Sequence, residues 1–236
     1  MTNAFFRTKA GTLIVGGIPR VVGTLSNLHY RGAMACDVVE VRLDRISRPG
    51  DWLARCKAIQ LSSGKPVLLT ARLRAEGGFW GNDDERRRVV YMDALRELAA
   101  VDVELGSAIC GGVAAEAERL HKGCVVSYHN FRETPALKEL CGLVEKAHGI
   151  GSIAKISTMV KRREDVAVLR ALLGRAWAKP LCVIGMGEAW AKTRVEFARL
   201  GSCLTYGYLD SCAAPGQWAA AELKRQLQGD DLVLRF

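Results

Sequence analysis

Short, nearly continuous apolar runs recur along the 236-residue chain and alternate with segments of helical periodicity. Runs rich in Val, Ile and Leu, without a regular polar alternation, are typical of strands that are covered on both faces. They predict eight strands, at Val21–Leu25, Asp37–Leu43, Val67–Ala71, Val101–Leu105, Cys124–Tyr128, Ser152–Ile156, Leu181–Ile184 and Cys203–Tyr206.

Between these runs, apolar residues recur at three- and four-residue spacing, which indicates amphipathic helices. Helices are predicted at Asp83–Ala99, Ala136–His148, Glu164–Arg175 and Trp218–Leu227. Thr134 followed by Pro135 is typical of an N-cap and a first helical residue, so this pair is predicted to begin the second of these helices.

Eight strands that alternate with helices predict a (β/α)8 barrel, formed by residues 1–236 as a single domain. A doubly wound open sheet is the alternative, but no GxGxxG motif follows the first strand. The first connection, Ser26 to Cys36, has room for only a short helix, so the first βα unit is expected to be shortened. The segment Thr8–Gly17 predicts a hairpin that turns at Gly16–Gly17 and closes the bottom of the barrel.

The net charge leaves two classes of partner open. The chain has 34 Lys+Arg and 25 Asp+Glu, a difference of +9, which suits either a nucleic-acid surface or a basic cleft for a small anion. The runs Arg86–Arg88 and Lys161–Arg163 would support the first option, but both lie where helices begin, and a solvated helix face is expected there.

Hydropathy and cysteine usage favour a cytoplasmic protein. The chain has no run of 18 or more apolar residues, the length that would indicate a membrane-spanning helix. Its N-terminus also lacks the pattern of a signal peptide. The eight cysteines include no CxxC pair and lie mostly among apolar residues, so we expect buried thiols and no metal site.

Polar residues gather at the carboxyl ends of the predicted strands, where barrels of this kind carry their active sites. A charge next to an apolar strand is costly unless it is paired or used. These candidates are Glu40, Arg42, Arg72, Glu76, His129, Lys155, Met186 and Arg194.

Lys155 is the most unusual of them, because it lies within a predicted strand between apolar neighbours. It could neutralise a carboxylate such as Glu104, or it could be an amine nucleophile that forms an imine with a carbonyl substrate. An ordinary lysine has a pKa of about 10.4, which burial beside other cations would lower. The cations expected nearby, which would also hold a substrate carboxylate, are Arg42, Arg72 and Arg194.

His129 is the one histidine that lies at the end of a predicted strand. Its imidazole could take up and return a proton near neutral pH, provided that a partner orients the ring. Glu76 is the candidate partner, and a purely structural histidine is the alternative.

In this order along the chain, these residues resemble the type I 3-dehydroquinate dehydratase family. The resemblance rests on Glu40-Val-Arg42, Arg72-x-x-x-Glu76-Gly-Gly, Ser127-Tyr-His129-Asn, Lys155-Ile, Met186-Gly187, Arg194 and Ala214-Pro215-Gly216-Gln217. It implies a (β/α)8 barrel that dehydrates 3-dehydroquinate, a small anion, to 3-dehydroshikimate. It also implies a cytoplasmic homodimer that needs neither a metal nor an organic cofactor and binds neither nucleic acid nor membranes.

The resemblance also implies a role for each candidate. Lys155 would form the imine, His129 would move protons and Glu76 would orient His129. Arg194 and Gln217 would bind the substrate carboxylate, and Met186 would lie in the same site. The remaining three residues would bind the ring hydroxyls or order the site; they are Glu40, Arg42 and Arg72.

One departure from the family concerns a predicted lid, Gly207–Gln217. Ala213 stands where the family usually has a serine, so weaker substrate binding is expected. Two alternatives to this function are an imine-forming class I aldolase-type barrel enzyme and a basic nucleic-acid-binding protein.

Overall fold

Eight parallel strands form a nearly closed barrel in the computed structural model, which describes residues 2–47, 49–212 and 216–228. Neighbouring strands pair in the order β10-β3-β4-β5-β6-β7-β8-β9. Backbone and side-chain contacts also join the two end strands, since Cys203 N donates to Leu181 O and Cys182 Sγ donates to Leu204 O. The strands are β3 (Arg20–Leu25), β4 (Val38–Arg42), β5 (Val67–Thr70), β6 (Ala100–Glu104), β7 (Gly123–Asn130), β8 (Ile153–Met159), β9 (Leu181–Met186) and β10 (Leu204–Tyr208).

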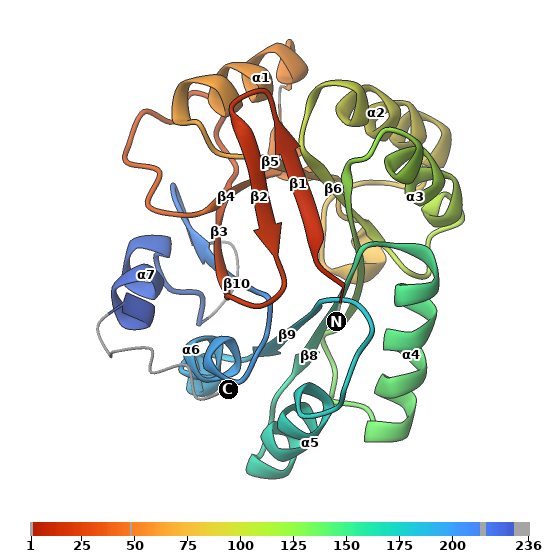
Figure 1. The fold of residues 1–236 in the computed structure, drawn as a ribbon, viewed down its shortest axis with the longest axis vertical. Coiled ribbons are helices and arrows are strands. Elements are labelled where there is room, and N and C mark those ends of the chain that lie inside the picture. Colours follow the sequence, from red (N-terminus) through yellow and green to blue (C-terminus); the bar gives the residue numbers. More distant parts are fainter. Residues whose placement is uncertain (1, 48, 213–215, 229–236) are drawn as a thin grey trace.

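Seven α-helices cover the outside of this sheet within the described ranges (Figure 1). They are α1 (Trp52–Ser63), α2 (Asp84–Glu97), α3 (Cys110–Arg119), α4 (Leu137–Ile150), α5 (Arg163–Leu173), α6 (Thr193–Arg199) and α7 (Ala220–Gln228). Residues 26–37, between β3 and β4, contain no helix, so the predicted shortening of the first βα unit is confirmed. The eight predicted strands and four predicted helices are also confirmed, with ends that differ by a few residues.

The start of α4 differs from the prediction. The helix begins at Leu137 with Ala136 as N-cap, and no side chain caps it. The Thr134 hydroxyl instead donates to Met159 O at 2.8 Å and contacts the Thr158 hydroxyl at 3.0 Å. The predicted N-cap was therefore wrong, because this hydroxyl joins the loop to the end of β8.

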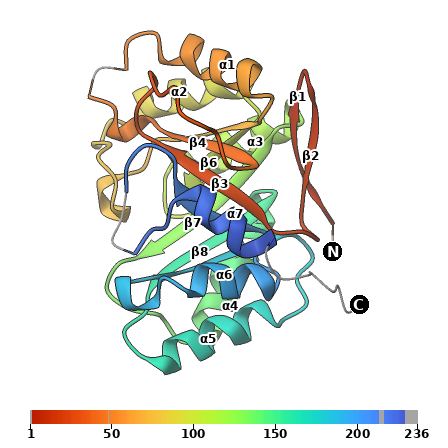
Figure 2. The ribbon, with the colours of Figure 1, turned by 90° about the vertical axis from the view of Figure 1, so that its left-hand side faces the viewer.

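An N-terminal hairpin of β1 (Ala4–Thr8) and β2 (Gly11–Val15) packs against the amino ends of the barrel strands (Figure 2). Its turn lies between Thr8 and Gly11, where the Thr8 hydroxyl accepts from Ala10 N and donates to Gly11 O. A hairpin that closes the bottom was predicted correctly, but the predicted turn at Gly16–Gly17 was wrong, because those glycines follow β2.

Phe6 carries the contact between the hairpin and the barrel, and it is fully buried. A Cβ atom added to Gly123, the first residue of β7, would lie 2.3 Å from the Phe6 ring. The hairpin thus fits only because the barrel strand begins with a glycine there. Behind Phe6, the inward side chains are apolar and include Val22, Leu68 and Ile153.

Within the described residues, the helices are all too short or too polar to cross a membrane. Seven cysteines are buried, as predicted, while Cys212 is exposed.

Candidate active site

The inward side chains change from apolar to polar toward the carboxyl end of most strands, whereas β9 keeps the apolar Ile184 and Met186 there. On β8, Ile153 belongs to the apolar core, whereas Lys155 and Ser157 line a cavity further along the same face. On β6, Ala100 is likewise followed by Asp102. Side chains two residues apart share one face of a strand, and all eight strands run in the same direction. The inward residues near the carboxyl ends of the strands therefore meet at one end of the barrel.

Lys155 lies in this polar layer and is 4% exposed. Its Nζ is 2.9 Å from Oδ2 of Asp102 and 4.3 Å from the centroid of the Tyr206 ring. The predicted neutralisation of a carboxylate is thus present, but its partner is Asp102 and not Glu104. Glu104 is occupied elsewhere, because it pairs with Arg72 and Arg87.

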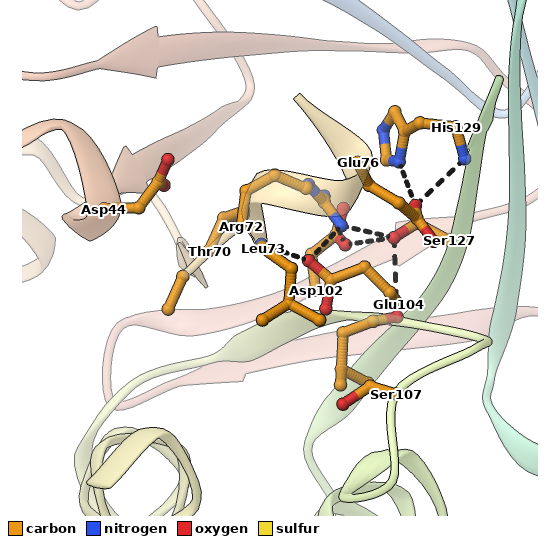
Figure 3. Close-up of polar contacts among 12 residues, drawn as sticks. Asp44, Thr70, Arg72, Leu73, Glu76, Asp102, Glu104, Ser107, Ser127 and His129 are labelled. Atoms are coloured by element: carbon orange, nitrogen blue, oxygen red, sulfur yellow. Dashed lines mark hydrogen bonds and ion pairs between the residues drawn. The ribbon is translucent and has the colours of Figure 1, made fainter. Parts of the chain in front are cut away.

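Asp102 is the centre of a buried network (Figure 3). Its Oδ1 accepts from Arg72 at 2.7 Å and from the Ser127 hydroxyl at 2.6 Å, while Oδ2 receives Lys155. Burial alone would raise the pKa of this carboxyl, but the charges of Arg72 and Lys155 outweigh burial and hold the pKa well below its ordinary range. The lysine therefore has a permanently charged partner.

Arg87 supports this layer from outside the barrel. It lies on α2, which begins where the Asp83 side chain accepts from Arg86 N, and it is fully buried. Its guanidinium pairs with Glu104 and donates to Ala71 O at 3.0 Å. The prediction that Arg86–Arg88 form a solvated helix face was therefore wrong for Arg87, because α2 turns this side chain toward β6.

His129 and Glu76 form a second close pair in the cavity. A 3₁₀ turn, Arg74–Glu76, ends at Gly77 with φ of 75° and brings the Glu76 carboxylate to the end of β7. One oxygen, Oε2, accepts from the backbone N of His129 at 3.0 Å and lies 2.8 Å from Nδ1 of the ring. The predicted partner of His129 is confirmed as its neighbour in space (Figure 3).

The protonation states of this pair suit a base. Burial, together with the charges of Arg72 and Lys155, holds the pKa of His129 well below its usual value of 6.5. Burial raises the pKa of Glu76 to about 7. His129 is therefore neutral at neutral pH, and the carboxylate beside Nδ1 favours the tautomer whose Nε2 can accept a proton.

Hydroxyl groups and a second ion pair fix the neighbouring carboxylates. The two oxygens of Glu40 accept from Thr24 at 2.9 Å and from Thr70 at 2.8 Å. Arg42 donates two hydrogen bonds to Asp44, at 2.9 and 2.8 Å. These contacts leave the carboxylates in single, defined positions.

Arg194 and Gln217 follow the last two barrel strands, β9 and β10. Arg194 lies at the start of α6, is 7% exposed, and donates to Gly216 O at 3.3 Å and Tyr206 O at 3.2 Å. Burial lowers the pKa of Arg194 to about 10. The Gln217 side chain is 3.5 Å from the Thr24 hydroxyl. The departure at Ala213, and the lid residues 214 and 215, lie outside the described residues.

One cavity brings all the predicted site residues together. It has a volume of about 120 Å³, which suits part of a small molecule and not a nucleic-acid strand. Its lining includes the nine predicted residues, Glu40, Arg42, Arg72, Glu76, His129, Lys155, Met186, Arg194 and Gln217. Over the same described residues, His, Cys, Asp and Glu form no group of three or more that could hold a metal ion.

Comparison with known proteins gives this cavity its context. The family described as type I 3-dehydroquinase matches residues 18–231. The chain belongs to the type I 3-dehydroquinase family.

Individual relatives agree with this assignment. A 3-dehydroquinate dehydratase of Methanothermobacter thermautotrophicus is 36% identical over 185 residues, which are 77% of this chain and 79% of the relative. One from Methanococcoides burtonii is 27% identical over 230 residues, or 93% and 98% of the two chains. The crystal structure of 3-dehydroquinate dehydratase from Geobacillus kaustophilus HTA426 aligns with a TM-score of 0.81 at 27% identity, covering 91% of this chain and 92% of that one. The fold is therefore the (β/α)8 barrel of this family.

Four residues of the cavity region were not predicted to act. Asp102 and Ser127 bind Lys155 and Arg72, the Tyr206 ring lies beside the amine, and Ser157 lines the same cavity. A strict period-two assignment of β6 would have indicated Asp102, because Val101 and Val103 occupy the opposite face of the strand.

Proposed function

We propose that the protein converts 3-dehydroquinate into 3-dehydroshikimate and water through an imine between Lys155 and the substrate ketone. The observation that carries this proposal is the placement of a buried amine in one cavity with the His129–Glu76 pair. In the cell the reaction would serve the shikimate route to aromatic amino acids.

Imine formation begins once the Lys155 ammonium has lost a proton. The free amine adds to the ketone carbon, one proton is taken up, and the ketone oxygen leaves as water, which gives a protonated imine. Asp102, held by Arg72 and Ser127, would remain as the counter-charge of the imine nitrogen.

Elimination then uses His129. Its neutral ring removes a proton from C2, and the C–H electron pair moves to the imine nitrogen to give an enamine. When the electron pair returns, the C1 hydroxyl leaves as water after taking the proton from His129. Hydrolysis of the conjugated imine consumes one water and frees both product and amine, so the net change is the loss of one water.

Substrate binding would use the basic and hydroxylated rim of the same cavity. Arg194 and Gln217 are proposed to hold the carboxylate, with Met186 packing against the ring. Glu40 and Arg42 would contact ring hydroxyls. The guanidinium of Arg72 is already bound by Asp102, Ser127 and Glu104, which supports an ordering role for this residue.

The direct test mixes the protein with 3-dehydroquinate and follows the absorbance of the conjugated product. We expect 3-dehydroshikimate as the single carbon-containing product. Fragments from carbon–carbon cleavage would indicate an aldolase, and salt-sensitive duplex binding without turnover would indicate a nucleic-acid-binding protein.

A cytoplasmic homodimer and a single domain over residues 1–236 stay predictions of the sequence. Sedimentation equilibrium of the purified chain tests the homodimer, with a mass of twice 25.7 kDa expected.

A further inference from the structure

Two buried hydroxyls in the cavity have no hydrogen-bond partner among the described residues. They are the Ser157 Oγ and the Tyr206 Oη, on side chains of residues that are 2% and 4% exposed. A buried hydroxyl that gives up water without gaining a partner destabilises the folded protein, and native structures contain few of them. Both residues line the cavity that contains Lys155.

Both hydroxyls belong to residues beside the amine. Lys155 Nζ lies 4.3 Å from the Tyr206 ring centroid. Ser157 follows Lys155 by two residues on the same face of β8, and its Cα pairs with that of His129 on β7. Ser157 therefore lies one inward position beyond the lysine, level with the proposed base His129.

The other polar groups around the amine are already committed. Asp102 and Glu40 are hydrogen-bond acceptors when ionised, and both receive hydrogen bonds from neighbouring side chains. The Ser127 hydroxyl donates to Asp102, and Arg72 binds Asp102, Ser127 and Glu104. Ser157 and Tyr206 are thus the hydroxyl donors next to the amine that the described residues leave unused.

The position of the Ser157 and Tyr206 hydroxyls indicates which substrate oxygen they could bind. The carbon that Nζ attacks must come within bonding distance of Nζ, so the oxygen on that carbon, one bond away, comes close to the groups around the amine. This oxygen gains negative charge as the C–N bond forms, and O–H donors placed beforehand stabilise such charge.

We propose that the Ser157 and Tyr206 hydroxyls form a donor pair for the oxygen of the carbonyl group that Lys155 attacks. The pair makes hydrogen bonds to the ketone oxygen and then to the same oxygen in the carbinolamine, and exchanges no proton with it. This inference rests on the proposed imine reaction and adds two positioning groups to it.

The test separates imine formation from elimination. The full-length protein is mixed rapidly with excess 3-dehydroquinate and quenched with borohydride at successive times, and the mass adduct on Lys155 is followed alongside product. In Ser157→Ala and Tyr206→Phe we expect adduct formation to slow by roughly tenfold or more in each. Conversion of the adduct to product should keep its wild-type rate.

Thermal unfolding of the same variants supplies a second readout. Because each change removes an unpartnered hydroxyl, we expect unchanged or higher melting temperatures. Thr158→Val is the matched control on β8, since the Thr158 hydroxyl is buried but contacts Thr134. That variant should melt earlier and form the adduct at the wild-type rate.

The outcomes distinguish this inference from the proposed function. Wild-type adduct rates in both variants, or equal slowing of adduct formation and elimination, would overturn the donor pair while leaving the imine reaction intact. Absence of any adduct in the wild-type protein would instead overturn the proposed function on which the pair depends.

Discussion

At the hairpin end of the barrel the inward side chains are apolar, whereas two residues further along most of the same strands they are charged or hydroxylated. Ile153 gives way to Lys155 on β8, and Ala100 gives way to Asp102 on β6. The apolar end is closed by Phe6 of the hairpin, and the polar end opens into the cavity.

The two ends also differ in how they meet the cost of burial. The hairpin end buries hydrocarbon, which is favourable in itself. The cavity end buries Asp102, Arg72 and Lys155, which is tolerable because each of their charges has a close partner. Stability and chemistry therefore occupy successive layers of one barrel, and substitutions should affect them separately.

The largest effect is expected from Lys155→Ala at the cavity end. Turnover should fall by at least about 10³-fold, because the nucleophile that would form the imine is lost. Asp102 keeps its contacts to Arg72 and Ser127, so circular dichroism should show the wild-type fold. A variant that retains substantial turnover would remove Lys155 from the mechanism.

At the hairpin end, Phe6→Ala should act on stability alone. The cavity left by this buried ring should lower the free energy of unfolding by about 3–5 kcal/mol, measured by denaturant unfolding. Phe5→Ala on the same strand is the control, because Phe5 is 36% exposed and should have a much smaller effect. A large loss of kcat in folded Phe6→Ala protein would contradict the separation of the two ends.

The buried ion pair between Arg87 and Glu104, outside the cavity, should give an effect of intermediate size. Arg87→Met leaves Glu104 without its partner from α2, and we expect a loss of about 3 kcal/mol in the free energy of unfolding. Arg88→Met, next to it on the exposed face of α2, should leave the melting temperature unchanged. Equal effects of the two substitutions would show that the buried pair does not support the layer.

The smallest effect concerns the pH dependence of Glu76→Gln. Because the pKa of Glu76 is raised to about 7, kcat/KM of the wild-type enzyme should rise as pH increases through 7 and the carboxylate forms. Glu76→Gln should lack this inflection and lose roughly tenfold in activity near neutral pH. An unchanged profile would exclude Glu76 as the group that titrates there.

The raised pKa of Glu76 predicts that stability falls with rising pH, whereas kcat/KM rises. A carboxyl whose pKa is higher in the folded than in the unfolded state stabilises the fold below its ordinary pKa of 4.5, and this contribution is lost as pH rises through about 7. The stability of the wild-type protein relative to Glu76→Gln should therefore decrease between these pH values. Urea unfolding at a series of pH values measures the trend.

The sequence predicted the barrel well because strands buried on both faces carry nearly continuous apolar runs, as in residues 67–69 of β5. The charged site candidates were predicted for a related reason, since charges next to such strands, as at Lys155, are conspicuous, whereas Gln217 was predicted only from the family resemblance. The hairpin turn was misplaced because Gly16–Gly17 is a stronger local signal than Thr8–Gly11, although packing of Phe6 decides the register.

Pairings across the barrel could not be obtained from the sequence in the same way. Asp102 and Glu104 are equivalent by strand periodicity, but Arg72, Arg87 and the backbone N of Leu73 bind Glu104, and Asp102 is the carboxylate that pairs with Lys155. The unpartnered state of the Ser157 and Tyr206 hydroxyls also depends on which neighbours the closed barrel brings near them.

Reductive capture of the proposed covalent intermediate tests the central claim most directly. The protein is treated with borohydride in the presence of 3-dehydroquinate, digested and analysed by mass spectrometry. The account predicts one stable adduct, on Lys155, that is absent from Lys155→Ala. An adduct on another lysine, or turnover of 3-dehydroquinate without any adduct, would contradict it.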